Sequence, residues 1–325
     1  MTTAMITGVG AIMGYGLLKS FRSSAPDVKL IGTDIYTDAV GRAWCDTFEQ
    51  APLTSSVEYA DWLLQTIEKN NVDILIPGIE QDVHWLSDHR QELKHLDCKI
   101  VLNNQKLIDL SRDKWAMHQE LAAASDASRI PSCLAGTFDS LSKSYGLPFL
   151  LKPRSSYASK GLIWVEKIDD FKQHSERLGE QLIAQPIIGS NDQEFTVAVF
   201  GDGDGGICAS ITFQRNLAPD GSTAKARVRN IDSLNKTVSR LCNHFKPVGP
   251  TNLQFRLDRN DEWKLLEINP RISSTSSIRT AFGYNEAAMC IEFYLQKQIP
   301  VQPVIREGFA IRYIEDHIIY DRDHF

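Results

Sequence analysis

The sequence predicts an α/β architecture that changes along the chain, from a parallel sheet covered by helices to an α+β region. Two observations support this prediction. In residues 1–105, short apolar runs alternate with helical stretches, a rhythm typical of a parallel sheet with helices on both faces. Between residues 130 and 270 strand-like runs predominate, and the glycine-rich stretch Gly201–Gly206 is typical of a hairpin turn. We therefore expect a Rossmann-like sheet first and a β-rich region after it.

The first 105 residues supply the expected parallel sheet. Its strands are short and apolar, as strands buried on both faces are. The expected strands are Ala4–Thr7, Val28–Asp34, Asp73–Pro77 and Lys99–Leu102. The expected helices are a segment ending at Phe21, Val57–Lys69 and Gln81–Leu96.

The remaining residues supply a second set of elements, in which strands outnumber helices. The expected helices are Gln105–Leu110, Asp113–Ala124 and Ile278–Gln296. The expected strands are Phe149–Lys152, Leu162–Val165, Leu182–Gln185, Phe195–Phe200 and Ile207–Phe213, followed by a hairpin within Thr251–Arg271.

Composition limits the class of protein. Of the 325 residues, 42% are hydrophobic and 23% charged, which is typical of a folded chain. The 35 basic and 41 acidic side chains give a net charge of −6, so we expect no nucleic-acid partner. No apolar stretch approaches the ~20 residues that span a bilayer, and the N-terminus lacks the basic region of a secretory signal. We expect a cytoplasmic protein with no membrane partner.

Cysteine and histidine spacing gives no metal motif. The six cysteines are scattered singly, and the eight histidines form no zinc-binding pattern. A structural zinc site is therefore not expected, and we expect the cysteines to be buried thiols.

The first strand runs into a glycine-rich turn, Gly8–Gly14, and Asp34 closes the next strand. Glycines at such a position let a pyrophosphate approach a helix N-terminus, and an acidic residue there can bind a ribose. The same turn also occurs in Rossmann-like sheets that bind no nucleotide. Both interpretations stay open on this motif alone.

The segment Thr251–Arg271 is the most informative part of the chain. Its apolar and polar residues alternate, which predicts a strand with one apolar and one polar face. If the hairpin turns at Asn260–Asp261, Gln254 lies opposite Glu267 and Asn252 lies opposite Asn269. One face would then gather carboxylate and amide oxygens, which are the ligands that Mg²⁺ prefers. A solvated hairpin with a polar face is the alternative.

Six segments, taken in order, make the chain resemble the ATP-grasp superfamily, in the branch of carbamoyl-phosphate synthetase large subunits and amino-acid ligases. They are Ser111–Lys114, Leu147–Arg154, Ser155–Gly161, Leu182–Gly189, Gln193–Thr196 and Glu267–Arg271. The resemblance implies a Rossmann-like pre-ATP-grasp domain at 1–105 and a two-lobed ATP-grasp fold after it. The small lobe with its linking helices would occupy 106–188 and the large lobe 189–325.

The resemblance also implies a site for ATP. In it, Lys114 and Lys152 would contact the phosphates, Gln185 and Ile187 would receive adenine, and Glu194 would bind the ribose hydroxyls. The Ser155–Gly161 loop would fold over the phosphates, and its small residues would permit close approach. Those expected at the phosphates are Ser155, Ser156 and Ser159.

A metal site is implied beside the phosphates. Glu267 and Asn269 would bind Mg²⁺, or Mn²⁺ in its place, with Gln254 assisting. Arg271 would stabilise the transferring phosphoryl group, which makes Arg271 and Lys152 the expected catalytic residues.

Two departures from the synthetases bear on the substrate. The chain has room for one grasp unit only, and Ser274 stands where the synthetases carry a second arginine. The loss of that cation disfavours bicarbonate and suggests a larger carboxylic acid. The residues expected near this substrate are Glu80, Arg215, Ser273, Ser274 and Arg279. A basic group of Arg215, Lys225, Arg227 and Arg229 is either part of the site or a solvated surface.

The resemblance implies an ATP-dependent ligase that joins a small-molecule carboxylic acid to an amine through an acyl phosphate. Dimers are common among similar ligases, so a homodimer is compatible with it. Three alternatives remain at this point: a carbamoyl-phosphate-type carboxylate kinase, a non-catalytic ATP-binding module, and a nicotinamide-dependent oxidoreductase that uses the glycine-rich turn.

Overall fold

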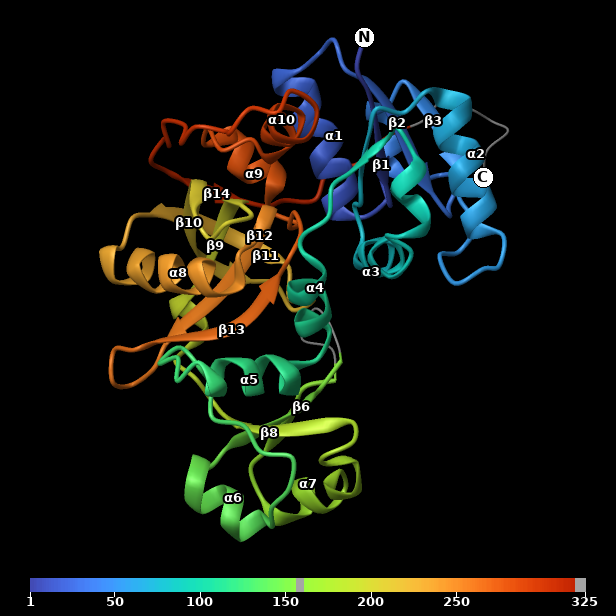
Figure 1. Ribbon diagram of the computed structural model, residues 1–325. Helices are drawn as coiled ribbons and strands as arrows, with labels where there is room; N and C mark the ends of the chain where they lie inside the picture. Colours follow the sequence, from blue (N-terminus) through green and yellow to red (C-terminus); the bar gives the residue numbers. More distant parts are fainter. Residues whose placement is uncertain (156–160, 319–325) are drawn as a thin grey trace.

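The computed structural model describes residues 1–155 and 161–318 and contains three β-sheets that follow one another along the chain (Figure 1). The N-terminal sheet and the largest sheet lie side by side, and the smallest sheet lies beyond them at the far end of the molecule. Ser156 and Ser159, two of the residues expected at the phosphates, lie outside the described residues. No helix in the described ranges is long and apolar enough to cross a membrane.

The first sheet is wholly parallel, as predicted, with the strand order β3-β2-β1-β4-β5. Its strands are β1 (Thr3–Thr7), β2 (Lys29–Asp34), β3 (Thr47–Gln50), β4 (Ile74–Ile76) and β5 (Lys99–Ile100). Its helices are α1 (Ile12–Ser24), α2 (Tyr59–Asn70) and α3 (Glu80–Asp88), with 3-10 turns at Val40–Trp44 and Glu92–His95. The apolar side of α1 covers one face, and α2 and α3 cover the other. Only β3, a short and partly exposed edge strand, was not expected.

The second sheet is small and antiparallel, with the order β7-β6-β8. Its strands are β6 (Phe149–Pro153), β7 (Ile163–Val165) and β8 (Leu182–Pro186). The helices α6 (Phe138–Tyr145) and α7 (Ile168–Lys172) share its apolar core. Two linking helices, α4 (Gln105–Arg112) and α5 (Lys114–Ala123), lead from the N-terminal sheet to this lobe (Figure 1).

The third sheet has six antiparallel strands in the order β13-β12-β9-β10-β11-β14. They are β9 (Glu194–Asp202), β10 (Ile207–Leu217), β11 (Thr223–Arg229), β12 (Val248–Leu257), β13 (Trp263–Asn269) and β14 (Phe309–Ile311). The predicted hairpin turn at Gly201–Gly206 joins β9 to β10. The helix α8 (Asp232–Phe245) covers one face of this sheet, and its apolar residues recur at helical spacing.

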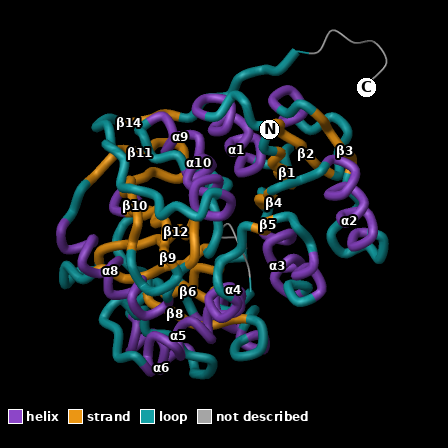
Figure 2. The backbone as a smooth tube through the Cα atoms, turned by 45° about the horizontal axis from the view of Figure 1, so that its top comes forward, coloured by secondary structure: helices purple, strands orange, loops and turns teal. Residues whose placement is uncertain are grey.

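The other face of the third sheet meets the N-terminal unit at one end and is open at the other. Alanine and phenylalanine side chains of β9 and β10 share one core with Leu17, Leu18 and Phe21 of α1. Figure 2 shows α1 and the C-terminal helices between the two sheets. The predicted long helix over 278–296 is divided into α9 (Ser276–Ala281), α10 (Glu286–Cys290) and a π-helical turn at Ile291–Leu295. Gly283, with φ of 101°, ends the first piece, and the Asn285 side chain caps the second.

The predicted pairing of β12 and β13 is confirmed. Asn252 lies opposite Asn269, and Gln254 lies opposite Glu267. A bulge follows Gln254, because Phe255 pairs with Leu265 and Leu266 is left as the extra residue. Glu267 and Asn269 therefore share the open face of the sheet with the polar residues of β12.

Candidate functional site

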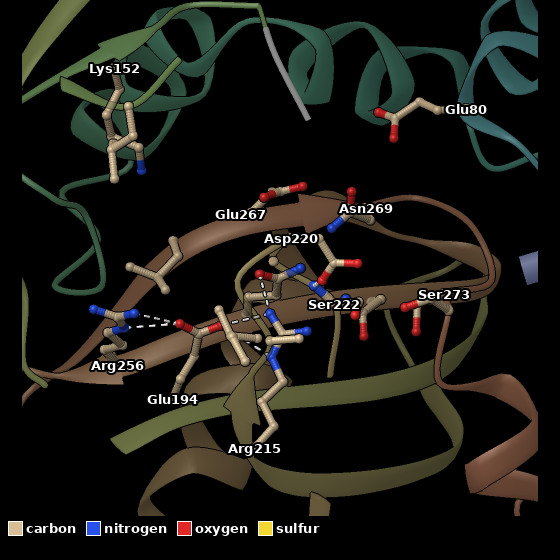
Figure 3. A pocket seen from close by; sticks show the side chains of 18 of the residues that line it. Glu80, Lys152, Glu194, Arg215, Asp220, Ser222, Arg256, Glu267, Asn269 and Ser273 are labelled. Atoms are coloured by element: carbon tan, nitrogen blue, oxygen red, sulfur yellow. Dashed lines mark hydrogen bonds and ion pairs between the residues drawn. The ribbon is translucent and has the colours of Figure 1, made fainter. Parts of the chain in front are cut away.

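A cleft of about 810 Å³ lies where the three units meet. Its walls come from the small lobe, the open face of the third sheet, the turn between β10 and β11, and the N-terminal ends of α1 and α3. Twelve of the seventeen residues expected from the sequence line it. They are Glu80, Lys152, Gln185, Ile187, Glu194, Arg215, Gln254, Glu267, Asn269, Arg271, Ser273 and Ser274. Figure 3 labels Glu80, Lys152, Glu194, Arg215, Glu267, Asn269 and Ser273 among them.

Strand register explains how residues distant in sequence gather on the cleft floor. Across neighbouring strands, Arg256 lies opposite Glu194, and Glu194 lies opposite Arg215. Two residues before Arg256 on β12, Gln254 lies opposite Glu267 of β13. Directly opposed residues point to the same face of a sheet, so these side chains form one polar surface.

Two lysines face this surface from other elements. Lys152 projects from β6 of the small lobe (Figure 3), and Lys114 is the first residue of α5. The backbone N–H of Lys114 donates to the carbonyl of Arg154 at 3.0 Å, and Arg154 is paired with Asp113 at 2.5 Å. Lys114 also borders a small cavity together with Glu267. Two cations are thereby held opposite the Glu267 carboxylate.

The lysine pKa values reflect this crowding. Burial, together with the charge of Lys114, lowers the pKa of Lys152 to about 8. Burial also lowers the pKa of Lys114, although Glu267 and Glu80 partly offset the effect. A site that holds two partly desolvated ammonium groups close together favours an added anion.

Arg271 links the large lobe to the N-terminal unit. Its Nη2 donates to Glu80 Oε2 at 2.6 Å and to Asn269 Oδ1 at 3.1 Å, and its Nη1 contacts the Met13 sulfur at 3.3 Å. Its Nε is buried and has no hydrogen-bond partner among the described residues. Burial alone would raise the pKa of Glu80, but the Arg271 guanidinium holds it below its usual value. Glu80, which was expected near the substrate, is thus engaged by Arg271.

Glu194 is placed differently from a simple ribose ligand. Its Oε1 accepts from Arg215 Nε and Nη2 at 3.1 and 2.6 Å, and its Oε2 accepts from Arg256 Nε and Nη2 at 3.0 and 2.7 Å (Figure 3). These four bonds match the roughly four acceptor positions of a carboxylate. Glu194 therefore holds two arginines at the cleft wall, and its expected role at the ribose stays a prediction.

We expect Glu194→Gln to destabilise the fold, because the Glu194 side chain is only 3% exposed and the two arginines would lose their shared counter-charge. Breaking a buried ion pair of this kind costs about 3 kcal/mol in the free energy of unfolding. Urea unfolding measures the effect, with Asp204→Asn in the exposed Gly201–Gly206 turn as the matched control. A loss no larger than that of the control would contradict the structural role of Glu194.

The inter-lobe end of the cleft is apolar. Ile187 lies on it after β8, and the Gln185 amide donates to Ser132 Oγ at 2.8 Å, which orients that amide. The other apolar lining residues are Ile130, Leu150, Leu162, Trp164, Ile188 and Leu266. An apolar lining with an oriented amide suits a heteroaromatic base.

The expected metal ligands present oxygens but form no protein cage. Within residues 1–155 and 161–318, no three His, Cys, Asp or Glu side chains cluster as a metal site. Glu267 supplies one carboxylate, while the amide oxygens of Asn269 and Gln254 accept from Arg271 and Arg215 at 3.1 and 2.7 Å. Mg²⁺ in proteins is commonly held by one or two carboxylates together with substrate phosphates. The donor set fits a metal of that kind.

Three expectations about basic residues and the phosphate loop are changed by the structure. Arg279 does not line the cleft: it is fully buried, paired with Glu286 at 3.1 Å and bonded at 2.5 Å to Asn252, which does line it, so Arg279 positions a floor residue without reaching the cleft. Within the basic group, Arg215 pairs with Ala226, so the flanking residues Lys225 and Arg227 point to the opposite face of the sheet. Ser155 is exposed at the end of the described small-lobe segment and does not line the cleft.

The Asp34 carboxylate stabilises the glycine-rich turn and the loop after β2 through backbone hydrogen bonds. Asp34 accepts from the backbone N–H of Gly10 at 2.7 Å and of Tyr36 at 3.1 Å, and it is 8% exposed. A carboxylate engaged in this way is not presented to a ribose, so nothing here supports the nicotinamide alternative. The turn instead brings the start of α1 to the cleft wall.

Sequence reasoning missed the turn between β10 and β11, which lines the cleft from Asn216 to Ser222. Its Pro219-Asp220-Gly221 triplet is a strong turn signal, but nothing in the sequence tells which side of the sheet the turn bends toward. Arg256 was missed for a similar reason, since its role depends on the neighbouring strand.

Models of two protein families match separate parts of the chain. Residues 180–317 match the family described as ATP-grasp in the biosynthetic pathway with Ter operon, and residues 5–101 match the PylC-like N-terminal domain. No curated protein matches the chain significantly.

Several solved structures are similar in fold. N5-carboxyaminoimidazole synthetase from Staphylococcus aureus, complexed with ADP, matches with a TM-score of 0.72 and 17% sequence identity, and the match covers 94% of this chain and 80% of the synthetase chain. The biotin carboxylase domain of Hydrogenobacter thermophilus 2-oxoglutarate carboxylase matches with a TM-score of 0.72 and 12% identity, over 95% of this chain and 73% of that one. Biotin carboxylase from Campylobacter jejuni matches with a TM-score of 0.69 and 16% identity, over 92% of this chain and 73% of that one. At these low sequence identities, the likeness shows that the fold is shared and shows nothing about activity.

Proposed function

Because this chain has the ATP-grasp fold, we propose that it is an ATP-dependent carboxylate–amine ligase that uses Mg²⁺. One observation supports the proposal: Lys114 of α5, Lys152 of β6 and Arg271, which follows β13, lie around the Glu267–Asn269 face of the cleft. Three cations around one carboxylate suit a triphosphate that shares a divalent metal with the protein. The similar structures include complexes with ADP and with its magnesium salt.

In this proposal ATP lies across the cleft floor. Its adenine occupies the apolar slot at Gln185 and Ile187, and its phosphates extend toward Lys114 and Lys152. Glu267 and Asn269, with Gln254 beside them, hold the metal, which supplies positive charge to the phosphates. Ser273 and Ser274 lie past the phosphates, where the acid and the amine bind.

The reaction needs positioning and charge stabilisation and no nucleophilic side chain. A carboxylate oxygen of the acid attacks the γ-phosphorus in line, the bond to the ADP oxygen breaks, and an acyl phosphate forms. Arg271 and Lys152 stabilise the negative charge that develops on the transferring oxygens. The amine nitrogen then attacks the acyl carbon, phosphate leaves, and the nitrogen loses a proton to solvent. The products are an amide, ADP and phosphate.

The proposed partners are a small-molecule carboxylic acid and a small-molecule amine, in the cytoplasm. We also propose a homodimer, since one of the similar structures is described as a domain dimer. Ser274 lines the cleft where the resemblance would place a second arginine, which favours an acid larger than bicarbonate.

The test is ADP release from MgATP in the presence of pooled carboxylic acids and amines, followed by mass spectrometry of the product. The proposal predicts ADP release that depends on both pools and an amide whose mass equals acid plus amine minus water. Release with bicarbonate alone would indicate a carboxylate kinase instead. Tight NADH binding without any nucleotide turnover would contradict the proposal.

A further inference from the structure

Asn252 lines the cleft but has no part in the proposed binding of nucleotide or metal. It lies on β12 opposite Asn269 of β13, while Gln254, two residues later, lies opposite Glu267. Alternate residues of a strand point to the same face of a sheet, so Asn252 shares the open face with Gln254. Beyond Asn269 the chain leads to Ser273, which lines the part of the cleft proposed for the acid and the amine. Asn252 therefore lies between the metal ligands and the substrate end of the cleft.

Two buried donors fix the orientation of the Asn252 amide. Thr196 Oγ1 donates to Asn252 Oδ1 at 2.6 Å, and Arg279 Nη2 donates to the same oxygen at 2.5 Å. Because a guanidinium carries donors and no acceptor, the amide atom next to Arg279 is the oxygen and cannot be the nitrogen. The NH2 group of Asn252 consequently points away from both donors.

Arg279 is itself held in place. Its Nη1 donates to both carboxylate oxygens of Glu286 at 3.1 Å, and neither side chain has any exposed surface. Arg279 lies on α9 and Glu286 on α10, two short helices that pack against α1. A buried ion pair is costly to break, so the donor that orients Asn252 is fixed by the packing of these helices.

The NH2 group of Asn252 has no acceptor within the part of the chain that the structure describes, and the residue is only 1% exposed. A buried polar group without a protein partner commonly marks a place for a ligand, an ion or water. Arg271 donates to Asn269 Oδ1 at 3.1 Å on the neighbouring strand. Directly opposed residues have Cβ atoms roughly 5 Å apart, so Asn252 lies near this cation. A donor beside a cation suits an anionic oxygen.

We propose that Asn252 is a further catalytic residue, whose Nδ2 donates a hydrogen bond to an oxygen of the transferring phosphoryl group, and that Arg279 is its positioning residue. The inference rests on the proposed ligase function and adds a residue to its first step. A donor that is oriented before the reaction stabilises developing charge without reorganisation. Asn252 thus acts in the transition state and contributes little to the binding of ADP, which lacks this phosphoryl group.

Equilibrium dialysis of MgADP, with and without aluminium fluoride, tests the proposal without knowledge of the acid or the amine. Aluminium fluoride bound beside ADP imitates the transferring phosphoryl group. In the wild-type protein we expect the fluoride to lower the dissociation constant of MgADP by about tenfold or more. If the fluoride produces no such gain in affinity, the assignment of Asn252 is overturned.

Two substitutions separate a catalytic role of Asn252 from a structural one. Asn252→Asp keeps an acceptor for Arg279 and Thr196 but turns an oxygen toward the phosphoryl group, whereas Asn252→Ala removes donor and acceptor together. In urea we expect the alanine variant to unfold first, because it leaves two buried donors without an acceptor. In dialysis we expect the opposite order, because the aspartate variant repels the fluoride and loses the whole gain. A purely structural role predicts that the gain follows stability.

Asn260→Asp, in the exposed turn between β12 and β13, is the matched control and should change neither quantity. Arg279→Lys should reduce the fluoride gain and leave the affinity for MgADP alone near the wild-type value, because the amide loses its fixed orientation. If Asn252→Ala or Arg279→Lys fails to fold, Asn252→Asp decides.

Turnover separates this inference from the proposed function. A fluoride gain that survives in Asn252→Asp, or one that follows stability among the variants, overturns the role of Asn252 and leaves the ligase standing. A gain that depends on Asn252, in a protein that releases no ADP with the pooled acids and amines, supports the donor and contradicts the ligase.

Discussion

Glu267→Gln is expected to lower kcat by about a thousandfold or more, because it removes a carboxylate that faces both lysines from the cleft floor. The substitution keeps the size and shape of the side chain, so the fold should be retained. The measurement is ADP release at saturating MgATP, with circular dichroism and thermal unfolding to verify the fold.

The matched control is Glu262→Gln in the turn of the same hairpin, where the carboxylate is 53% exposed and paired with Lys264 outside the cleft. It should leave turnover near the wild-type value, because exposed ion pairs contribute little. Undiminished turnover in Glu267→Gln would contradict the metal assignment.

Lys152→Ala is expected to raise the dissociation constant of MgATP by about ten- to a hundredfold, because a charge-assisted hydrogen bond to phosphate is among the stronger contacts in a partly desolvated site. Calorimetry with a non-hydrolysable analogue measures it. Lys143→Ala, an exposed lysine on α6, serves as control and should change nothing. An unchanged affinity in Lys152→Ala would remove that residue from the nucleotide site.

The same lysine predicts a pH dependence. In the free protein its pKa is about 8, below the usual value for lysine, so the ammonium form is lost as pH rises through 8. Phosphate binding requires that form, and nucleotide affinity should therefore fall between about pH 7.5 and 9. Lys152→Arg, whose charge persists, should flatten the profile. An equally steep fall in Lys152→Arg would assign the titration to another group.

The elements that build the cleft floor could be predicted because their signals are local. The alternation of apolar and polar residues in Thr251–Arg271 indicated two half-buried strands. The expected position of the turn then placed Glu267 opposite Gln254, as the structure has them. The short buried strands of the N-terminal sheet were equally visible. The alternation of apolar and polar residues could not reveal the bulge at Leu266. This bulge changes the pairing offset on the side of the turn and leaves Gln254 opposite Glu267.

Other features depend on tertiary partners and leave no local signal. Arg256 and Arg215 share Glu194 only because β12 and β10 flank β9, and Arg312 reaches Ser274 only because β14 joins the sheet edge. The helix expected over 278–296 breaks where Gly283 adopts a left-handed conformation, although the apolar pattern continues through it. In this segment, the packing of α9 and α10 against α1 outweighs the local propensity for one continuous helix.

We propose that the oxygen donors at the end of β13 hold a divalent metal against the phosphates of ATP. A crystal structure with Mn²⁺ and a non-hydrolysable ATP analogue is the decisive experiment, since anomalous scattering locates the metal. We expect an anomalous peak within bonding distance of both the Glu267 carboxylate and a phosphate oxygen, with Asn269 beside it. Nucleotide bound elsewhere, or a metal that touches phosphate while Glu267 stays remote from it, would refute this placement.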